Sequence, residues 1–209
     1  IWWLCARTLV AAEPADEPWR CLDLLVADRT ERELAHLLPE GATVAVVGWP
    51  ERLESTLGPR GDVEVEVIDV EGDGPGFVPE LERSGVVARD VGVAGLAATV
   101  AAADLLLVDL RAAGAARAFV APGSWAAAAV ARAAGVAVWG VAGVGRVLPA
   151  RLWSAVERRV DEAEGRAWSP DLEAVPTALL DRVATERGLE PVAEALARSD
   201  APDAPELAR

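Results

Sequence analysis

The sequence contains no lysine, asparagine, glutamine, methionine or tyrosine, and all 20 of its basic residues are arginine. Losing so many residue types at once is hard to explain by function, so we interpret it as a biased coding composition. Because methionine is missing, the sequence has no initiator residue, which leaves open whether further residues precede Ile1.

Positive charge is also scarce, since 34 acidic residues against 20 arginines give a net charge of −14. A nucleic-acid-binding face needs clustered cations that displace counterions from the phosphates. Here the arginines are scattered and have acidic neighbours, as in Glu31-Arg32-Glu33. We therefore expect a solvated surface of mixed sign and no nucleic-acid partner.

Metal-binding side chains of the soft type are few, because Cys5, Cys21 and His36 are the only cysteines and the only histidine. Their spacing assembles no zinc site, so we expect no metal. Two thiols that do not form a close pair are typical of a reduced compartment, which predicts a cytoplasmic location. The lone His36 is interpreted as a structural residue.

A membrane-spanning segment is not expected either. The two most apolar stretches, 93–110 and 118–145, are interrupted by Asp104 and Arg132, and their many alanines add little insertion energy. Residues 1–4 follow no basic segment and open no long apolar region, so we expect no signal peptide. The sequence therefore predicts a chain without a membrane partner.

What the sequence does contain is a series of apolar runs bounded by glycine or proline and separated by amphipathic segments. A continuous apolar run suits a strand covered on both faces, as in a parallel sheet. Strands that alternate with short helices indicate βαβ units, so we expect an α/β fold with a Rossmann-like, mainly parallel sheet and flanking helices. The expected strands are 43–47, 63–68, 86–88, 104–109 and 136–139, and the expected helices are 29–38, 51–58, 79–83, 93–102 and 124–134.

The last third of the chain is more charged and is expected to be helical. Leu179, Leu180 and Val183 share one face of a helical pattern, so this segment is expected to pack on the sheet. The expected helices here are 149–164, 176–187 and 190–198.

The domain division follows from these elements. We expect an N-terminal helical segment over residues 1–40 and a Rossmann-like α/β domain over 41–198. The tail 199–209, rich in alanine, proline and aspartate, is expected to fray.

Two groups of motifs resemble a known family. The first is Asp104–Asp109, the pair Gly123-Ser124 opening an alanine-rich helix, and Ala134–Trp139. The second is Asp171, Val175-Pro176, Leu179-Leu180-Asp181 and Thr185-Glu186-Arg187-Gly188, in that order. With the strand at 43–47, these segments resemble the initiation factor 2B α/β/δ subunits and methylthioribose-1-phosphate isomerases over residues 30–192. The family's helical region before the sheet is longer, so here it is shortened or not included.

The resemblance implies where isomerase chemistry would lie. In the family, a cysteine after the first core strand and an aspartate in a Gly-Ala-Asp turn move a proton between adjacent carbons of a sugar phosphate. The cysteine position falls at Gly48-Trp49, and the aspartate position falls at Arg111, with Asp109 two residues away. The family's Asn-Lys pair is Val120-Ala121 here. We therefore expect the isomerase mechanism to be absent.

A ligand crevice is still expected, because open α/β sheets bind ligands beyond the carboxyl ends of their strands and against helix N-termini. The strand assignments place Gly48, Asp109, Arg111, Gly123 and Ser124 there as candidate ligand-binding residues. Ser124 is either a helix N-cap or a phosphate donor, and the cap is favoured. Arg111 is either a replacement anion anchor or a surface charge, with equal weight.

Two glycine-rich patterns are interpreted as turns. Gly72-x-Gly74-x-Gly76 lies between acidic residues whose charge would repel a phosphate. Gly140-x-x-Gly143-x-Gly145 does not have the spacing of the dinucleotide fingerprint, so we expect no cofactor. The eight tryptophans form no stacking stripe and are assigned to core and interface packing.

Two functions of different classes remain. The favoured one is an initiation factor 2B subunit-like protein that serves as a non-catalytic binding or regulatory module. It would bind a sugar phosphate or nucleotide and form a homodimer, as its relatives assemble. The alternative is an aldose–ketose isomerase-type enzyme that acts on a phosphorylated sugar through Asp109 and Arg111. A link to translation follows from the family name alone.

Overall fold

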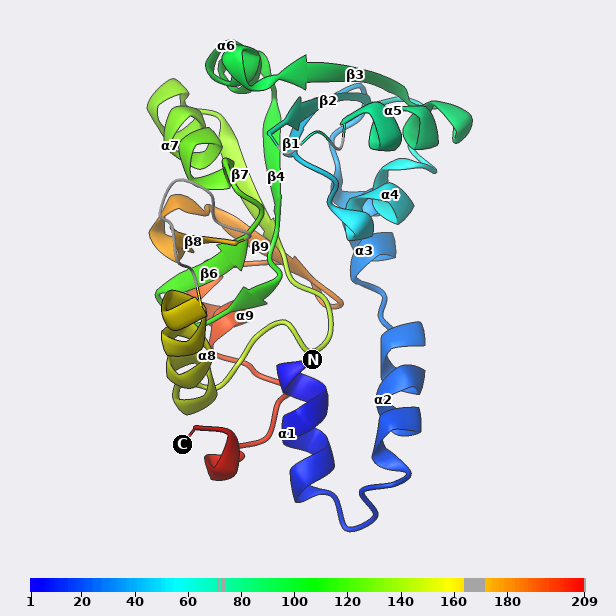
Figure 1. The fold of residues 1–209 in the computed structure, drawn as a ribbon. Coiled ribbons are helices and arrows are strands. Elements are labelled where there is room, and N and C mark those ends of the chain that lie inside the picture. Colours follow the sequence, from blue (N-terminus) through cyan, green and yellow to red (C-terminus); the bar gives the residue numbers. More distant parts are fainter. Residues whose placement is uncertain (71, 73, 164–171, 209) are drawn as a thin grey trace.

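The computed structural model of the chain describes residues 1–70, 72, 74–163 and 172–208 (Figure 1). Within them the central sheet has seven strands in the order β10-β9-β7-β4-β1-β2-β3. All neighbours are parallel except β10, which runs antiparallel to β9. The strands are β1 (Thr43–Val47), β2 (Glu64–Asp69), β3 (Val87–Gly92), β4 (Leu105–Asp109), β7 (Ala137–Val141), β9 (Arg182–Thr185) and β10 (Gly188–Glu190).

This strand order confirms the predicted Rossmann-like fold. From β3 through β1 to β9 it is the doubly wound order, in which the chain first builds one half of the sheet and then returns to build the other. The reversal lies between β1 and β4, where Val44 pairs with Leu105. All five strands expected from the sequence lie in this one sheet.

Both faces of the sheet are covered by helices, because the strands are apolar on both sides. In β1, Val44 and Val46 pack toward one face and Ala45 and Val47 toward the other. Figure 1 shows the two helical layers on opposite sides of the strands. One layer contains α3 (Thr30–Leu37), α4 (Glu51–Leu57) and α5 (Gly74–Arg83); the other contains α6 (Leu96–Ala102), α7 (Ser124–Ala134) and α9 (Val192–Leu196).

The strand β4 lies at the centre of the core. Leu105 and Leu107 are buried on one face and Leu106 on the other. Truncating a fully buried leucine to alanine costs about 2–5 kcal/mol, so each of these side chains matters for the free energy of unfolding.

A smaller antiparallel sheet extends the domain beside the carboxyl end of β4. It consists of β5 (Ala112–Ala113), β6 (Arg117–Val120) and β8 (Glu173–Pro176). The helix α8 (Ala150–Ala163) packs on it, with the rings of Phe119 and Trp153 4.8 Å apart. This contact starts a separate apolar cluster.

The separate cluster extends to both ends of the chain. The helices α1 (Trp2–Val10) and α2 (Glu17–Val26) form a hairpin below the sheet (Figure 1). Trp3 and Cys21 from this hairpin share the cluster with Ala201 and Ala204 from the C-terminal segment. The division of the chain into a helical segment, a sheet domain and a frayed tail stays a prediction, although these two alanines are buried.

The helix expected at 176–187 is wrong. This segment is a short 3₁₀ turn, Thr177–Leu179, followed by β9 and β10. Asp181 fixes β9 against β7, because its backbone N–H donates to the Val138 carbonyl and its carboxylate accepts from the Val138 N–H, each at 2.8 Å. Gly188 turns the hairpin with a φ of 100°.

Other boundaries move by smaller amounts. The helix expected from 79 begins at Gly74 as α5, and the helix expected at 190–198 is shortened to α9. The α7 and α8 helices match the predictions within the described residues. None of the helices in the described part of the chain has the length and apolarity needed to cross a bilayer.

Candidate functional site

The structure brings the five predicted site residues together at the switch point between β1 and β4. Asp109 ends β4, Arg111 follows it, and Ser124 begins α7; all three line one small hollow with Trp49. Its volume is about 10 Å³, which is room for one water at most. Whether these residues bind a ligand is not tested by this arrangement and stays a prediction.

The two glycines among the predicted site residues have backbone conformations and close contacts that favour glycine. Gly48 and Gly123 have φ values of 65° and 87°, where side chains with a Cβ are strained. A Cβ on Gly123 would also lie 2.8 Å from Cγ2 of Val70. Both residues therefore shape the turns that bring β1 and α7 together.

The N-terminus of α7 differs from the prediction. Its N-cap is Gly123 rather than Ser124, which is the first residue of the helix. The N–H of Trp125 donates to Oε2 of Glu173, on β8, at 2.7 Å. A helix N-terminus attracts anions through its free N–H groups and its dipole. Here the chain's own carboxylate already occupies that position.

Trp49, one of the residues that line the small hollow, is held in place by packing on α5. The ring of Trp49 lies 5.7 Å from that of Phe77 on α5. A Cβ on Gly76 would lie 2.7 Å from Cζ3 of Trp49, so the α5 backbone also touches the ring. The thiols lie elsewhere, since Cys5 is on α1 and Cys21 is on α2.

A much larger cavity lies between the α1–α2 hairpin and the sheet, and the sequence did not predict it. Its volume is about 560 Å³. Its walls come from the two helices, and its floor comes from residues near the carboxyl ends of the strands. The lining residues are Ile1, Trp3, Leu4, Pro18, Trp19, Cys21, Leu22, Leu25, Arg52, Arg111, Val144, Gly145 and Arg146.

Arg111 is the charged residue that both hollows share. Its backbone N–H donates to the Phe119 carbonyl at 2.8 Å, and its carbonyl accepts from Nη1 of Arg146 at 2.8 Å. These bonds tie the segment after β4 to the small sheet and to the loop after β7. Arg111 is therefore held at the boundary between the closed crevice and the cavity.

Asp28 anchors the helical hairpin to the sheet. Its carboxylate accepts from Nη1 of Arg52 and from the N–H groups of Thr30 and Val144, each at 2.9 Å. Burial alone would raise the pKa of Asp28, but these hydrogen bonds and the Arg52 charge lower it overall. Burial raises the pKa of the neighbouring Glu31. The charged form of Asp28 is thus part of the folded structure.

Two glycines after β7 leave room for the α1–α2 hairpin to pack close to the sheet. A Cβ on Gly143 would collide with the Arg52 guanidinium and the Asp28 carboxylate. A Cβ on Gly145, whose φ is 76°, would lie 2.7 Å from the ring of Trp3. The predicted turn at 140–145 therefore also contacts α1 and Asp28, the residue that ties the end of the α1–α2 hairpin to the sheet. The closely spaced glycines were the sequence signal that could have indicated this contact.

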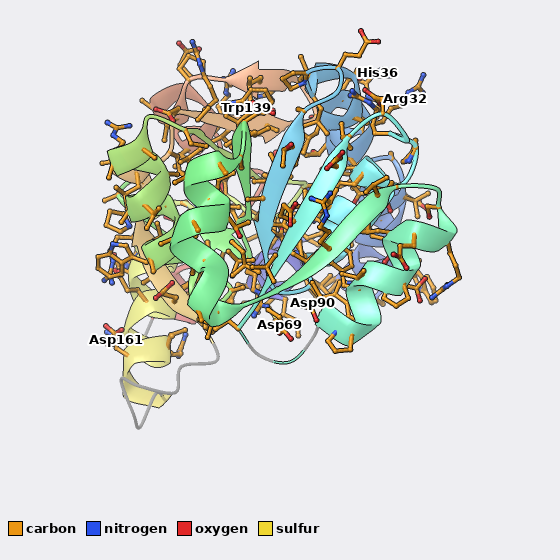
Figure 2. All side chains as sticks on the ribbon, turned by 90° about the horizontal axis from the view of Figure 1, so that it is seen from above. Arg32, His36, Asp69, Asp90, Trp139 and Asp161 are labelled. Atoms are coloured by element: carbon orange, nitrogen blue, oxygen red, sulfur yellow. The ribbon has the colours of Figure 1, made fainter. Side chains whose placement is uncertain are left out.

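Acidic side chains lie close together at the β2–β3 edge of the sheet. Figure 2 shows Asp69, on β2, and Asp90, on β3, next to each other, and both lie against the start of α5 at Gly74. The Asp69 carboxylate accepts from the Gly72 N–H. The predicted turn thus lies in an acidic environment. Among the described residues, no three His, Cys, Asp or Glu side chains are grouped as a metal site.

Comparison with solved structures assigns the fold. eIF2B beta from Chaetomium thermophilum matches with a TM-score of 0.67 and 16% identity, over 89% of this chain and 56% of that one. The translation initiation factor eIF-2B from Pyrococcus horikoshii OT3 matches with a TM-score of 0.70 and 13% identity, over 91% and 76%. The chain has the fold of the initiation factor 2B subunits.

The isomerase branch has the same fold. The 5-methylthioribose 1-phosphate isomerase from Pyrococcus horikoshii OT3 matches with a TM-score of 0.64 and 16% identity, over 88% of this chain and 61% of that one. The resemblance drawn from the sequence motifs is thus confirmed at the level of the fold. No protein-family model matches the sequence, and no curated protein does.

The similarity covers only part of the related chains. This chain spans little more than half of the eIF2B beta chain, at 56%. Chains of this fold are also found in a tetrameric complex of eIF2B beta and delta subunits from C. thermophilum. At these identities the likeness establishes the fold alone.

Proposed function

We propose that this chain is a non-catalytic binding module built on the initiation factor 2B fold, in which Arg111 provides the cationic contact for an anionic ligand. The observation that carries the proposal is the closed crevice at the switch point. About 10 Å³ remains beside Trp49, so a sugar phosphate would have to displace that ring.

The chemistry of the crevice supports the same conclusion. A proton transfer between carbons needs a base and an acid on opposite sides of the substrate. The crevice is lined by Asp109 and Arg111, and a guanidinium group does not serve as a base in proteins. The carboxylate of Glu173 at α7 also repels a phosphate from the helix N-terminus.

One observation favours the isomerase-type alternative. Asp109 lines the crevice, as the alternative requires if it replaces the family's aspartate from two residues away. In that case a movement of Trp49 would open the crevice for a phosphorylated sugar.

Partners and location belong to the same proposal. We infer assembly with a second copy or a related subunit, supported by the tetrameric eIF2B complex among the structures of this fold. We infer a cytoplasmic location, supported by the free thiols of Cys5 and Cys21. A role in translation initiation is carried by the fold likeness only.

The test is turnover of methylthioribose-1-phosphate by the purified chain and by Asp109→Asn. We expect no turnover above background, since a positioned proton-transfer group contributes roughly two to four powers of ten in rate. Turnover in the wild type that is lost in Asp109→Asn would establish the alternative. Stabilisation by anionic ligands should be lost in Arg111→Ala and kept in Arg151→Ala, a variant of an exposed arginine on α8.

A further inference from the structure

We propose that the cavity beneath α1 and α2 binds a single-chain amphiphile: an alkyl chain that ends in an anionic head group, a carboxylate or a phosphate. This inference rests on the binding role proposed above and names the class of ligand. Its two supports are the composition of the cavity walls and the charge of the cavity floor.

The walls are apolar and open to solvent. Trp19, Leu22 and Leu25 line the cavity from α2, and Ile1 and Leu4 line it from the start of α1. Trp19 is 68% exposed and Leu22 is 48% exposed. Single exposed apolar residues are common on protein surfaces, but here they gather on the walls of one hollow, as in sites that an apolar ligand covers.

The positive charge of the floor comes from Arg111 and Arg146, because Arg52 is ion-paired with Asp28 and Glu31. Arg52, Arg111 and Arg146 line the floor, and no acidic residue is among the described residues that line the cavity. Arg52 is held by Asp28, and Arg146 is held by its bond to the Arg111 carbonyl. The guanidinium group has the fork geometry that matches the oxygens of carboxylates and phosphates.

This combination selects an alkyl chain over a sugar. The volume of about 560 Å³ lies within the range of roughly 300–1,000 Å³ that small-ligand sites occupy. A sugar placed against Leu22 and Leu25 would lose hydrogen bonds from its hydroxyls to water without replacing them. An alkyl chain has no such bonds to lose, and its burial releases the water that the exposed walls now order.

The test is isothermal titration calorimetry with the full chain and soluble probes kept below their micelle-forming concentrations. Hexyl, octyl and decyl phosphate should bind roughly fourfold more tightly for each added methylene, because each one is buried. Decanoate compares the carboxylate with the phosphate head group. Decanol, which has no charge, should bind about tenfold more weakly or worse. Inorganic phosphate and ribose 5-phosphate should not compete.

Two matched pairs of variants locate the site. Leu22→Ala should weaken decyl phosphate binding roughly tenfold, whereas Leu24→Ala should leave it unchanged. Leu24 is 41% exposed on the same helix but does not line the cavity. Arg146→Ala should weaken binding of the anionic probes about tenfold, with Arg32→Ala, an exposed arginine on α3 (Figure 2), as the control.

Each of the following results would contradict one part of the proposal. Equal effects of Leu22→Ala and Leu24→Ala, affinity independent of chain length, or competition by ribose 5-phosphate would overturn the assignment of the cavity. Failure of every amphiphile to bind, with self-association that Leu22→Asp abolishes in sedimentation, would assign the face to a second copy instead. Turnover of methylthioribose-1-phosphate would refute the non-catalytic role by itself, so the two failures are distinguishable.

Discussion

The two hollows at the carboxyl end of the sheet differ in almost every property that matters for binding. The crevice between β1 and β4 has about 10 Å³, is lined by Trp49 among others, and lies beside a helix N-terminus where Glu173 accepts a hydrogen bond. The cavity under the N-terminal helices has about 560 Å³, apolar walls and three arginines. Open α/β sheets bind ligands at the switch point, where the crevice is small in this chain, and the larger cavity next to it is the site that we propose.

The comparison shows how a shared fold can separate from a shared site. The strands follow from the apolar runs of the sequence, and the switch point lies where the strand order reverses in the folded sheet. The site depends on single residues, such as a tryptophan after β1 and an arginine after β4. Function therefore has to be argued from those residues rather than from the fold.

The largest expected effect comes from removing the hydrogen bonds of Asp28, which hold the α1–α2 hairpin against the sheet and so form the cavity. Asp28→Asn should lower the free energy of unfolding by about 3 kcal/mol, because it removes the nearer of the two carboxylates that pair with the mostly buried Arg52 and leaves only Glu31, at 3.7 Å. Urea denaturation measures this. Asp23→Asn, at an exposed aspartate on α2, is the control and should cost little. A cost below about 1 kcal/mol for Asp28→Asn would mean that the hairpin does not depend on this anchor.

Opening the crevice is the next test of the comparison. Trp49→Ala should cost about 2 kcal/mol, since a half-buried ring loses its contact with Phe77. Trp125→Ala is the control, because that ring is 43% exposed on α7. The enlarged crevice should still not bind ribose 5-phosphate in calorimetry. Binding by Trp49→Ala alone would show that the ring is all that closes the family site.

A smaller effect is expected at the N-terminus of α7. Glu173→Gln should destabilise the chain by about 1 kcal/mol, since it weakens the charged acceptor for the Trp125 N–H. Thermal unfolding against Glu82→Gln, at an exposed residue of α5, measures the difference. If added phosphate stabilises Glu173→Gln but not the wild type, the carboxylate is what keeps anions away.

The pH dependence should be the finest of these effects. The pKa of Asp28 is lower in the folded chain than its ordinary value of 3.8, so its stabilisation is complete above about pH 5. As the pH falls through the folded pKa, that stabilisation is lost. The contribution of Asp28 to the stability difference between wild type and Asp28→Asn should therefore be flat from about pH 7 to 5 and narrow below that. Glu31 titrates in both proteins, but its pKa is raised by burial and also by the Asp28 charge, so its contribution does not cancel completely in this difference.

The sequence predicted the central sheet well and its far end poorly. Strands such as 104–109 are continuous apolar runs, which have few alternatives to a buried strand. The segment 176–187 has leucines and a valine at helical spacing, and the hydrogen bonds between Asp181 and Val138 that make it a strand join residues far apart in the sequence. No local pattern contains that information.

The sequence likewise predicted one part of the candidate site and missed another. Asp109, Arg111 and Ser124 could be placed at one edge of the sheet because the carboxyl ends of parallel strands lie at the same edge. The cavity could not, because it forms where Leu22 and Leu25 of the hairpin meet Arg146, more than a hundred residues later. The sequence contains Gly143 and Gly145, but it does not show why glycine is required at these positions. In the structure, Arg52 and Trp3 leave no room for a Cβ there.

The most direct test of the separation between fold and site is a crystal structure with decyl phosphate bound, read for the position of the phosphorus atom. We predict it within hydrogen-bonding reach of the Arg111 and Arg146 guanidinium groups, with the alkyl chain against Leu22 and Leu25. A phosphate at the N-terminus of α7 beside Ser124, with Glu173 displaced, would contradict the account and return the site to the switch point.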